Sequence, residues 1–151
     1  MFDLRDLYQQ VIVDHNKSPR NFGKLAECNH EADGYNPLCG DKLHVYLQIN
    51  DDGIIDNVSF EGEGCAISIA SASLMTDAIK GKPVAEFEAL FQNFQNMVTS
   101  DITEMPDEGR LGKLAVFAGV REFPSRIKCA ILCWHTMKSA VRGSDQPAKT
   151  E

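Results

Sequence analysis

A β-hairpin between residues 42 and 60 is the feature that most restricts how this chain can fold. Residues 42–50 alternate in character, and one face of the segment carries the apolar side chains Leu43, Val45, Leu47 and Ile49. Asp51-Asp52-Gly53 is a strong turn signal, and residues 54–60 continue as a second strand. Because two strands alone are only marginally stable in water, a third strand near residues 28–35 and covering helices must complete the sheet.

Helical patterns surround this hairpin. The predicted helices cover residues 2–15, 66–80, 84–98, 111–120 and 124–142. Because the helices are mostly segregated from the strands along the chain, the predicted fold class is α+β, with a small antiparallel three-stranded sheet covered by helices. We expect one domain over residues 1–143 and a disordered tail over residues 144–151.

Composition and charge exclude several classes of protein. The 151 residues are 43% hydrophobic and 25% charged, which is ordinary for a globular chain and excludes a disordered chain, a coiled coil and a collagen. The net charge of −7 argues against general binding of nucleic acid and of anionic membranes. No apolar run approaches the roughly 18–20 residues of a membrane helix, and the charged N-terminus lacks an apolar signal core, so we expect a cytoplasmic protein.

Five cysteines, an odd number, favour metal or thiol chemistry over a disulfide framework in that compartment. Cys39 and Asp41 are two apart in an extended segment, so their side chains point the same way. Cys65 follows a glycine-rich turn at the mouth of a helix, and Cys129 lies in the first two turns of the last helix. Three sulfurs and one carboxylate oxygen could thus converge on a tetrahedral Zn²⁺ ion.

Spacing alone leaves the alternative open that each cysteine is a small buried hydrophobic residue. Cys133 lies one helical turn after Cys129 and is expected in the core beside Trp134. Cys28 precedes a polar stretch and is interpreted as an isolated thiol without a ligand role.

Several segments together carry a family resemblance that covers residues 3–142. They are Leu7-Tyr8-Gln9-Gln10-Val11-Ile12-Val13-Asp14-His15 with Ser18-Pro19-Arg20-Asn21, Asn36-Pro37-Leu38-Cys39-Gly40-Asp41, Gly62-Glu63-Gly64-Cys65 with the small-residue helix after it, and Phe123-Pro124-Ser125-Arg126-Ile127-Lys128-Cys129. In these segments the chain resembles the U-type iron–sulfur cluster assembly proteins, the NifU N-terminal/IscU-like family. Within it, the chain is most similar to the SufU branch, because it has a long segment between Pro83 and Pro124 and has Lys128 where IscU-like proteins have histidine.

The resemblance implies a fold, a site and partners. Cys39, Asp41, Cys65 and Cys129 would be zinc ligands, and Cys39 would be the sulfur acceptor. A PLP-dependent cysteine desulfurase would supply persulfide sulfur, and a downstream iron–sulfur scaffold or apo-protein would receive it. Any catalytic activity would be of the sulfurtransferase kind, not that of a free-standing hydrolase or oxidoreductase.

Two other functions remain open at this point. In the first, Cys39, Cys65 and Cys129 hold a [2Fe–2S] cluster, and the protein is a scaffold that assembles and transfers it. The missing histidine before Cys129 argues against that function. In the second, zinc is purely structural and the protein is an adaptor.

Overall fold

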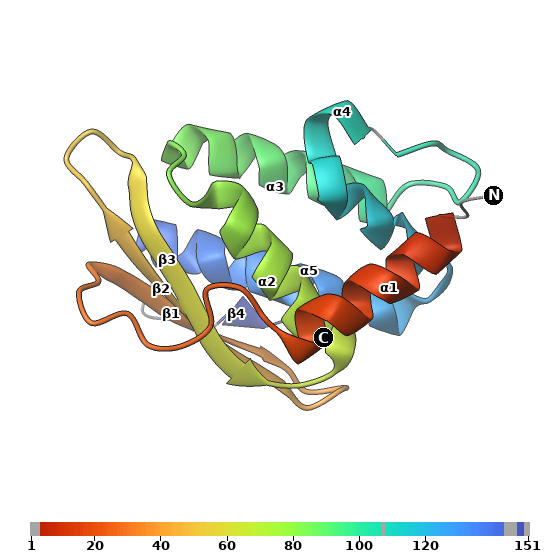
Figure 1. The fold of residues 1–151 in the computed structure, drawn as a ribbon, viewed down its shortest axis with the longest axis horizontal. Helices are drawn as coiled ribbons and strands as arrows, with labels where there is room; N and C mark the ends of the chain where they lie inside the picture. Colours follow the sequence, from red (N-terminus) through yellow and green to blue (C-terminus); the bar gives the residue numbers. More distant parts are fainter. Residues whose placement is uncertain (1–3, 107, 144–147, 150–151) are drawn as a thin grey trace.

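The computed structural model describes residues 4–106, 108–143 and 148–149. The elements in chain order are α1 (Leu4–Lys17), β1 (His30–Asn36), β2 (Asp41–Ile49), β3 (Ile55–Glu63), α2 (Ala66–Ile79), α3 (Val84–Val98), α4 (Glu108–Leu111), η1 (Gly112–Glu122), α5 (Pro124–Arg142) and β4 (Ala148–Lys149). Figure 1 shows their arrangement, with α2 and α5 packed against the sheet. The predicted α+β class is confirmed.

The sheet has the strand order β3-β2-β1-β4. β1 pairs with β2 and β2 pairs with β3, both antiparallel, which confirms the hairpin and the third strand of the prediction. Val45 lies opposite Phe60 and Leu47 lies opposite Val58, so the apolar face that the alternation predicts is buried as one surface. Gly53 has a φ of 77°, as the tight turn between the two strands requires.

The segment 144–151 is only partly described. Within it, the two-residue strand β4 pairs in parallel with β1, next to Gly34 and Tyr35. The predicted disordered tail otherwise lies outside the described residues.

Trp134 of α5 forms the centre of the core. Its ring stacks on Phe94 at a centroid distance of 4.7 Å and on Phe87 at 6.1 Å, and Phe91 packs against it at 6.0 Å. The aromatic side chains Phe87, Phe91 and Phe94 of α3 therefore lie in the core, as their helical spacing predicts. α5 begins at Pro124 and ends at Arg142, and the following residue Gly143, with a φ of 69°, forms a left-handed cap.

The segment between α3 and α5 differs in detail from the prediction. The short apolar segment predicted as helix over residues 111–120 is the helical turn α4 followed by the 3₁₀ helix η1. Its apolar side chains, among them Leu114, Phe117 and Val120, are buried. Tight i to i+3 winding allows this segment to fill the space between α1, α3 and α5.

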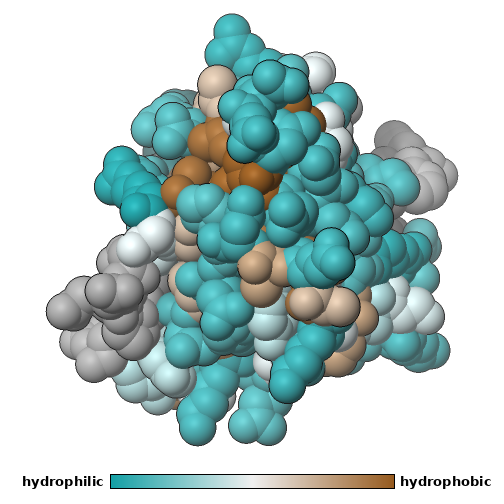
Figure 2. All heavy atoms as spheres, turned by 90° about the vertical axis from the view of Figure 1, so that its left-hand side faces the viewer, coloured by the Kyte–Doolittle hydropathy of each residue, from teal (hydrophilic) through white to brown (hydrophobic). Residues whose placement is uncertain are grey.

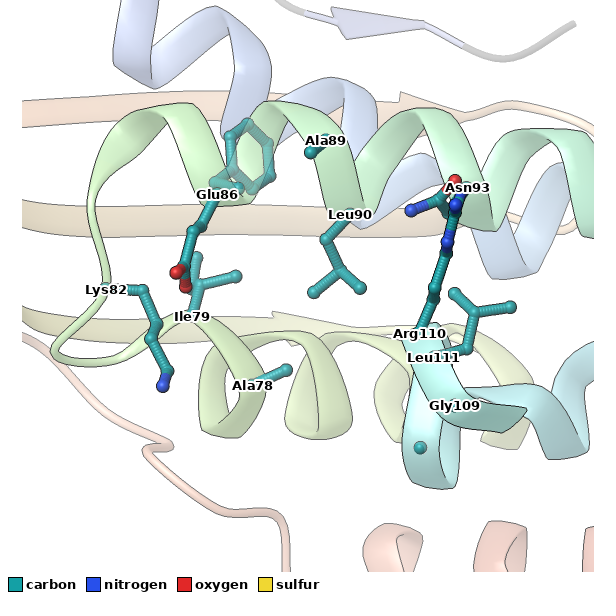
Figure 3. Close-up of a pocket in the computed structure, with 12 residues that line it drawn as sticks. Ala78, Ile79, Lys82, Glu86, Ala89, Leu90, Asn93, Gly109, Arg110 and Leu111 are labelled. Atoms are coloured by element: carbon teal, nitrogen blue, oxygen red, sulfur yellow. The ribbon is translucent and has the colours of Figure 1, made fainter. Parts of the chain in front are cut away.

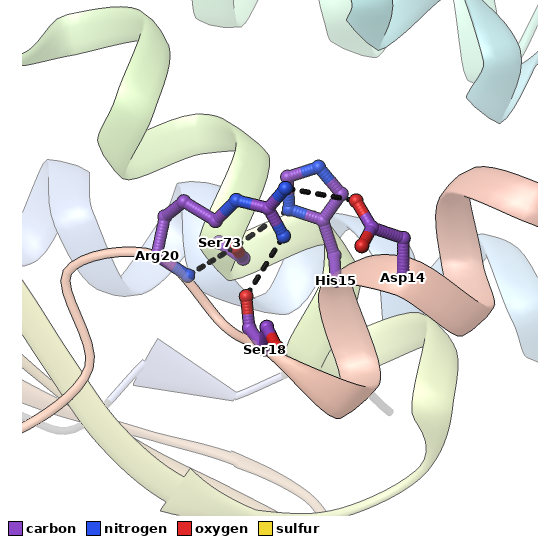
Figure 4. Close-up of polar contacts among 5 residues, drawn as sticks. All are labelled: Asp14, His15, Ser18, Arg20 and Ser73. Atoms are coloured by element: carbon purple, nitrogen blue, oxygen red, sulfur yellow. Dashed lines mark hydrogen bonds and ion pairs between the residues drawn. The ribbon is translucent and has the colours of Figure 1, made fainter.

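Ser73 of α2 forms hydrogen bonds with the end of α1 and with the loop that follows α1. Ser73 Oγ lies 2.7 Å from His15 Nδ1 and accepts a 2.7 Å hydrogen bond from the backbone N–H of Arg20 (Figure 4). The Arg20 side chain turns back to form a 2.8 Å ion pair with Asp14. The loop after α1 is thus held against the middle of α2.

The end of the molecule that carries the β2–β3 turn is mostly hydrophilic, with one apolar patch in its upper part (Figure 2). Among the described residues, no helix combines the length and the apolar character that crossing a membrane requires.

Candidate metal centre

Three of the four predicted ligands lie together in the structure. The ligand atoms of Cys39, Asp41 and Cys129 are all within 4.8 Å of one another. The sulfurs of Cys39 and Cys129 are 3.3 Å apart, and both cysteines are free thiols. The β1–β2 turn, the start of β2 and the start of α5 therefore converge on one point, although 90 positions separate the two cysteines.

Cys39 and Asp41 occupy opposite environments at the turn between β1 and β2. Cys39 is exposed, whereas Asp41, the first residue of β2, is 1% exposed. Gly40 between them has a φ of 71°, a left-handed conformation that glycine adopts without steric cost. The turn thus places one ligand at the surface and the next in the interior.

Both carboxylate oxygens of Asp41 are hydrogen-bonded. Oδ1 accepts the backbone N–H of Cys65 at 2.8 Å, and Oδ2 accepts the side-chain amide of Asn36 at 3.1 Å. Gly64 leaves room for this arrangement, because a Cβ atom on residue 64 would collide with Asp41 Oδ1. The buried carboxylate is therefore satisfied and held in one orientation.

Cys65 stands at the edge of this group. It caps the N-terminus of α2, and its sulfur accepts the backbone N–H of Ser68 at 3.4 Å. The set of ligand atoms within 4.8 Å does not include Cys65, but Cys65 contacts Cys129. The hydrogen bond from Cys129, together with the N–H of Ser68 and despite partial burial, lowers the pKa of Cys65 to about 7.

Cys129 is the buried sulfur of the site, 2% exposed. Its pKa is raised, first by its interaction with the Cys65 thiol, then by burial and by its interaction with Cys39. A divalent cation at this point would favour the deprotonated form of each of its ligands.

Asn36 is a residue of this site to which the sequence analysis assigned no role. It is completely buried at the end of β1, and its amide nitrogen lies 3.1 Å from Asp41 Oδ2 and 3.4 Å from Cys129 Sγ. The signal in the sequence is the alternation Ala32, Gly34, Asn36, which places a polar side chain on the covered face of the strand.

The surroundings of the site include an aromatic ring and a cation. Burial raises the pKa of Tyr8 of α1, the charge of Arg126 opposes that rise, and Cys65 and Cys129 add to it. Arg126 lies over the ring of Phe123 at 4.2 Å. Phe123 and Leu38, the residue before Cys39, are exposed apolar side chains.

The other two cysteines lie elsewhere. Cys133 is fully buried, 3.4 Å from Ser71 Oγ in the interface between α2 and α5, which confirms its predicted place in the core. Cys28 donates to Glu31 outside the site, as expected of an isolated thiol.

A separate cleft lies between α2, α3 and α4 (Figure 3). Its floor is apolar, with Ile79 and Leu90, and Lys82 and Arg110 lie near its two ends. No cysteine or histidine is among the described residues that line it.

A known protein family matches most of the chain. The model of the NifU-like N terminal domain family matches residues 7–130, a stretch that includes Asn36, Cys39, Asp41, Cys65 and Cys129.

Two curated relatives cover nearly the whole chain. The zinc-dependent sulfurtransferase SufU of Bacillus subtilis is 42% identical over 92% of this chain and 92% of its own length. The iron–sulfur cluster assembly scaffold protein IscU of Streptococcus pyogenes is 40% identical over 93% of this chain and 86% of its own length.

The fold has solved counterparts. A crystal structure of an iron–sulfur cluster assembly scaffold protein for the SUF system from Fervidobacterium islandicum superposes with a TM-score of 0.80. The two chains are 34% identical, and the match covers 91% of this chain and 98% of the other.

Proposed function

This chain belongs to the NifU-like N-terminal domain family that includes SufU and IscU, and from that premise we propose that it is a zinc-dependent sulfur-transfer protein. It would accept persulfide sulfur from a PLP-dependent cysteine desulfurase and pass it on to iron–sulfur cluster assembly. The observation that carries the proposal is the group of Cys39, Asp41 and Cys129, in which Cys39 is exposed and the other two residues are buried.

The donor atoms fit zinc. Two sulfurs bound to one tetrahedral Zn²⁺ at about 2.3 Å lie about 3.8 Å apart, close to the 3.3 Å between Cys39 and Cys129. Thiolates with one carboxylate oxygen are ligands that zinc accepts. Cys65, in contact with Cys129, is the proposed fourth ligand, and its Ser68 cap can persist because a metal-bound thiolate still accepts an N–H.

Zinc would supply one kind of chemistry here: it keeps the thiols deprotonated without oxidising them. The residues of the chain do the rest. Asp41, held on both oxygens, is the hard ligand among soft ones. Cys39 is the exposed thiol and can meet a persulfide carried by another protein.

The transfer step balances without an added oxidant. The Cys39 thiolate attacks the outer sulfur of the desulfurase persulfide and forms a new S–S bond. The S–S bond of the desulfurase breaks, and its cysteine leaves as a thiolate. The outer sulfur keeps its proton, so Cys39 ends as a persulfide and the donor is ready for another cycle.

The test is transfer of labelled sulfur. Zinc-loaded protein is mixed with a cysteine desulfurase of a SUF system and [³⁵S]cysteine, and the label is located by peptide mapping without reductant. We expect it on the peptide of Cys39, and we expect it to disappear in Cys39→Ala but not in the control Cys28→Ala. Unchanged labelling of Cys39→Ala, or no labelling of the zinc-loaded parent, would refute the proposal.

A second function is kept because the scaffold IscU is almost as similar as SufU, at 40% against 42% identity. In it, Cys39, Cys65 and Cys129 bind a [2Fe–2S] cluster that is passed to an apo-protein. Anaerobic addition of iron and sulfide separates the two functions. A stable visible chromophore that moves intact to an apo-ferredoxin supports the scaffold, and a protein that retains zinc and stays colourless supports sulfur transfer.

A further inference from the structure

Asn36 is a buried polar side chain that lies within hydrogen-bond distance of two candidate ligands from different elements. We infer that Asn36 is a positioning residue of the metal site, which holds Asp41 and Cys129 in a fixed relation while Cys39 stays free to leave. The inference rests on the proposed function, because it concerns how the same site releases one ligand.

The contacts of Asn36 match this role. Its amide nitrogen lies 3.1 Å from Asp41 Oδ2 and 3.4 Å from Cys129 Sγ, both within hydrogen-bond distance. An amide NH₂ group has two hydrogens, so it can donate to the carboxylate and to the sulfur at the same time. One side chain on β1 thus connects the start of β2 with α5.

The orientation of the amide is determined by its neighbours. If the group were turned over, its oxygen would face a carboxylate oxygen of Asp41, and two acceptors would meet without a proton between them. The arrangement with the NH₂ group toward Asp41 and Cys129 is therefore favoured. It is favoured more strongly when Cys129 is a thiolate, because hydrogen bonds to charged acceptors are the stronger ones.

The amide oxygen of Asn36 indicates that this residue does not serve the stability of the fold alone. Asn36 is 0% exposed, and its Oδ1 has no hydrogen-bond partner among the described residues. An unsatisfied buried acceptor is destabilising, and an apolar side chain of similar shape, such as leucine, would avoid that cost. The two donated hydrogen bonds are what leucine would lose.

Cys39 lacks such an anchor. It lies in the turn of residues 37–40, is exposed, and has its sulfur against Cys129 Sγ at 3.3 Å. Asp41, by contrast, is held by Asn36 and by the backbone of Cys65, and Cys129, itself buried in α5, is held by Asn36. Because Asp41 and Cys129 are held by these hydrogen bonds and Cys39 is not, release of Cys39 from the metal would disturb fewer contacts than release of either of them.

The first test compares Asn36→Leu with the control Ser68→Ala. Ser68 is also buried next to the site, and its hydroxyl has no partner among the described residues, so its removal should leave the ligands in place. Zinc affinity is measured by competition with a chromogenic chelator. Replacing residues that orient metal ligands typically weakens affinity about 10–100-fold, and we expect that loss in Asn36→Leu and less than threefold in Ser68→Ala.

A second measurement distinguishes a loss of ligand positioning from a general loosening of the structure. The zinc-loaded proteins are treated with iodoacetamide, and the modification of each cysteine is followed by mass spectrometry. Among the three proposed zinc-bound cysteines of the parent, we expect Cys39 to react first and Cys129 last. In Asn36→Leu we expect the ratio of Cys129 to Cys39 modification to rise about tenfold, with Cys133 still protected. An unchanged ratio together with unchanged zinc affinity would overturn the inference.

A measurement on the unaltered protein covers the case in which Asn36→Leu fails to fold. Cadmium-113 replaces zinc, and the side-chain amide of Asn36 is observed by NMR in protein labelled with ¹⁵N-asparagine. We expect one amide proton to be shifted downfield, slowed in exchange, and coupled to the cadmium through the Cys129 sulfur. An amide that exchanges freely and shows no such coupling overturns the inference.

The two proposals fail in different ways. A parent protein that binds no zinc refutes the proposed function and the role of Asn36 with it. A parent that binds zinc and accepts sulfur, with an Asn36 amide that responds neither to cadmium nor to substitution, refutes only the role of Asn36.

Discussion

Asp41 Oδ1 accepts the backbone N–H of Cys65 at 2.8 Å, so a side chain at the start of β2 holds the first residue before α2. This hydrogen bond connects two positions that are 24 apart in the chain. It holds the open end of the β2–β3 hairpin against the N-terminus of α2. One candidate ligand thereby fixes the backbone of another, and metal binding and local folding are coupled at this point.

Replacing Asp41 should therefore affect both properties. Asp41→Ala removes one ligand, leaves the Cys65 N–H without an acceptor and leaves the Asn36 amide with only the Cys129 sulfur, and a buried polar group that loses its partner costs about 1–3 kcal/mol. We expect a loss of at least about 2 kcal/mol in urea unfolding of the metal-free protein, as well as weaker zinc binding. A variant that loses zinc affinity with no change in metal-free stability would show that this hydrogen bond does not support the fold.

Gly64→Ala should damage the site through the same carboxylate. The added Cβ would collide with Asp41 Oδ1, so either the carboxylate or the backbone must move. We expect zinc affinity to fall at least about tenfold, in the range seen when ligand orientation is disturbed. The matched control is Glu63→Ala, one residue earlier and exposed, which should bind zinc like the parent. Equal affinities of the two variants would contradict the prediction.

Gly34→Ala should destabilise the sheet–helix packing and leave zinc binding unchanged. A Cβ on residue 34 would collide with Thr136 Oγ1 of α5, and overpacking of this kind costs about 1–3 kcal/mol. Because Thr136→Ala removes the colliding hydroxyl and methyl groups, the double variant should regain much of the loss. Urea unfolding of the four proteins forms a double-mutant cycle, and strictly additive losses would be inconsistent with a direct clash.

His15 should make stability fall in mild acid. Burial, and then the charge of Arg20, lower the pKa of His15, although Asp14 opposes the shift. The unfolded chain therefore binds this proton more readily than the folded protein does. The contribution to stability is complete above the unfolded pKa of about 6.5 and is lost as the pH falls from there through the lower folded pKa.

The measurement is the free energy of unfolding of metal-free protein between about pH 7.5 and 5. Burial also lowers the pKa of His135, so both histidines give the same sign. His15→Gln keeps a polar group near Ser73 but cannot titrate, and we expect a shallower decline than in the parent. Parallel pH curves would exclude His15 as the source.

Removal of zinc should lower the stability of the protein. The site connects the β1–β2 turn with α5, so bound metal stabilises the folded state by about 1.4 kcal/mol for each tenfold excess of free zinc over its dissociation constant. We expect the thermal midpoint to fall with chelator and to return with zinc. Cys28→Ala should respond like the parent and Cys129→Ser should not, and a midpoint independent of zinc in the parent would contradict the prediction.

The hairpin and the helices could be predicted because their signals are local. Alternation over residues 42–49, the Asp-Asp-Gly turn and the helical spacing of Phe87, Phe91 and Phe94 are all properties of short windows. The structure places these elements within a few residues of the predicted bounds. The 3₁₀ winding of η1 was not predictable, because the packing of its neighbours decides it.

The candidate ligands were also named from the sequence, but their arrangement was not. Motifs identify Cys39, Asp41, Cys65 and Cys129 one segment at a time. The finding that Asn36 touches two of them, or that Cys65 lies slightly apart, depends on how β1, α2 and α5 pack.

The sequence by itself determined the α+β class, the segments that carry the thiols and the family to which the chain belongs. Only the tertiary structure decided that Cys39 is exposed to solvent, that Asp41 and Cys129 are buried beside it, and that Asn36 is hydrogen-bonded to both of those residues. The reason is physical. Periodicity and turn chemistry act over a few residues, whereas the burial and hydrogen bonding of a side chain depend on which distant segments pack against it.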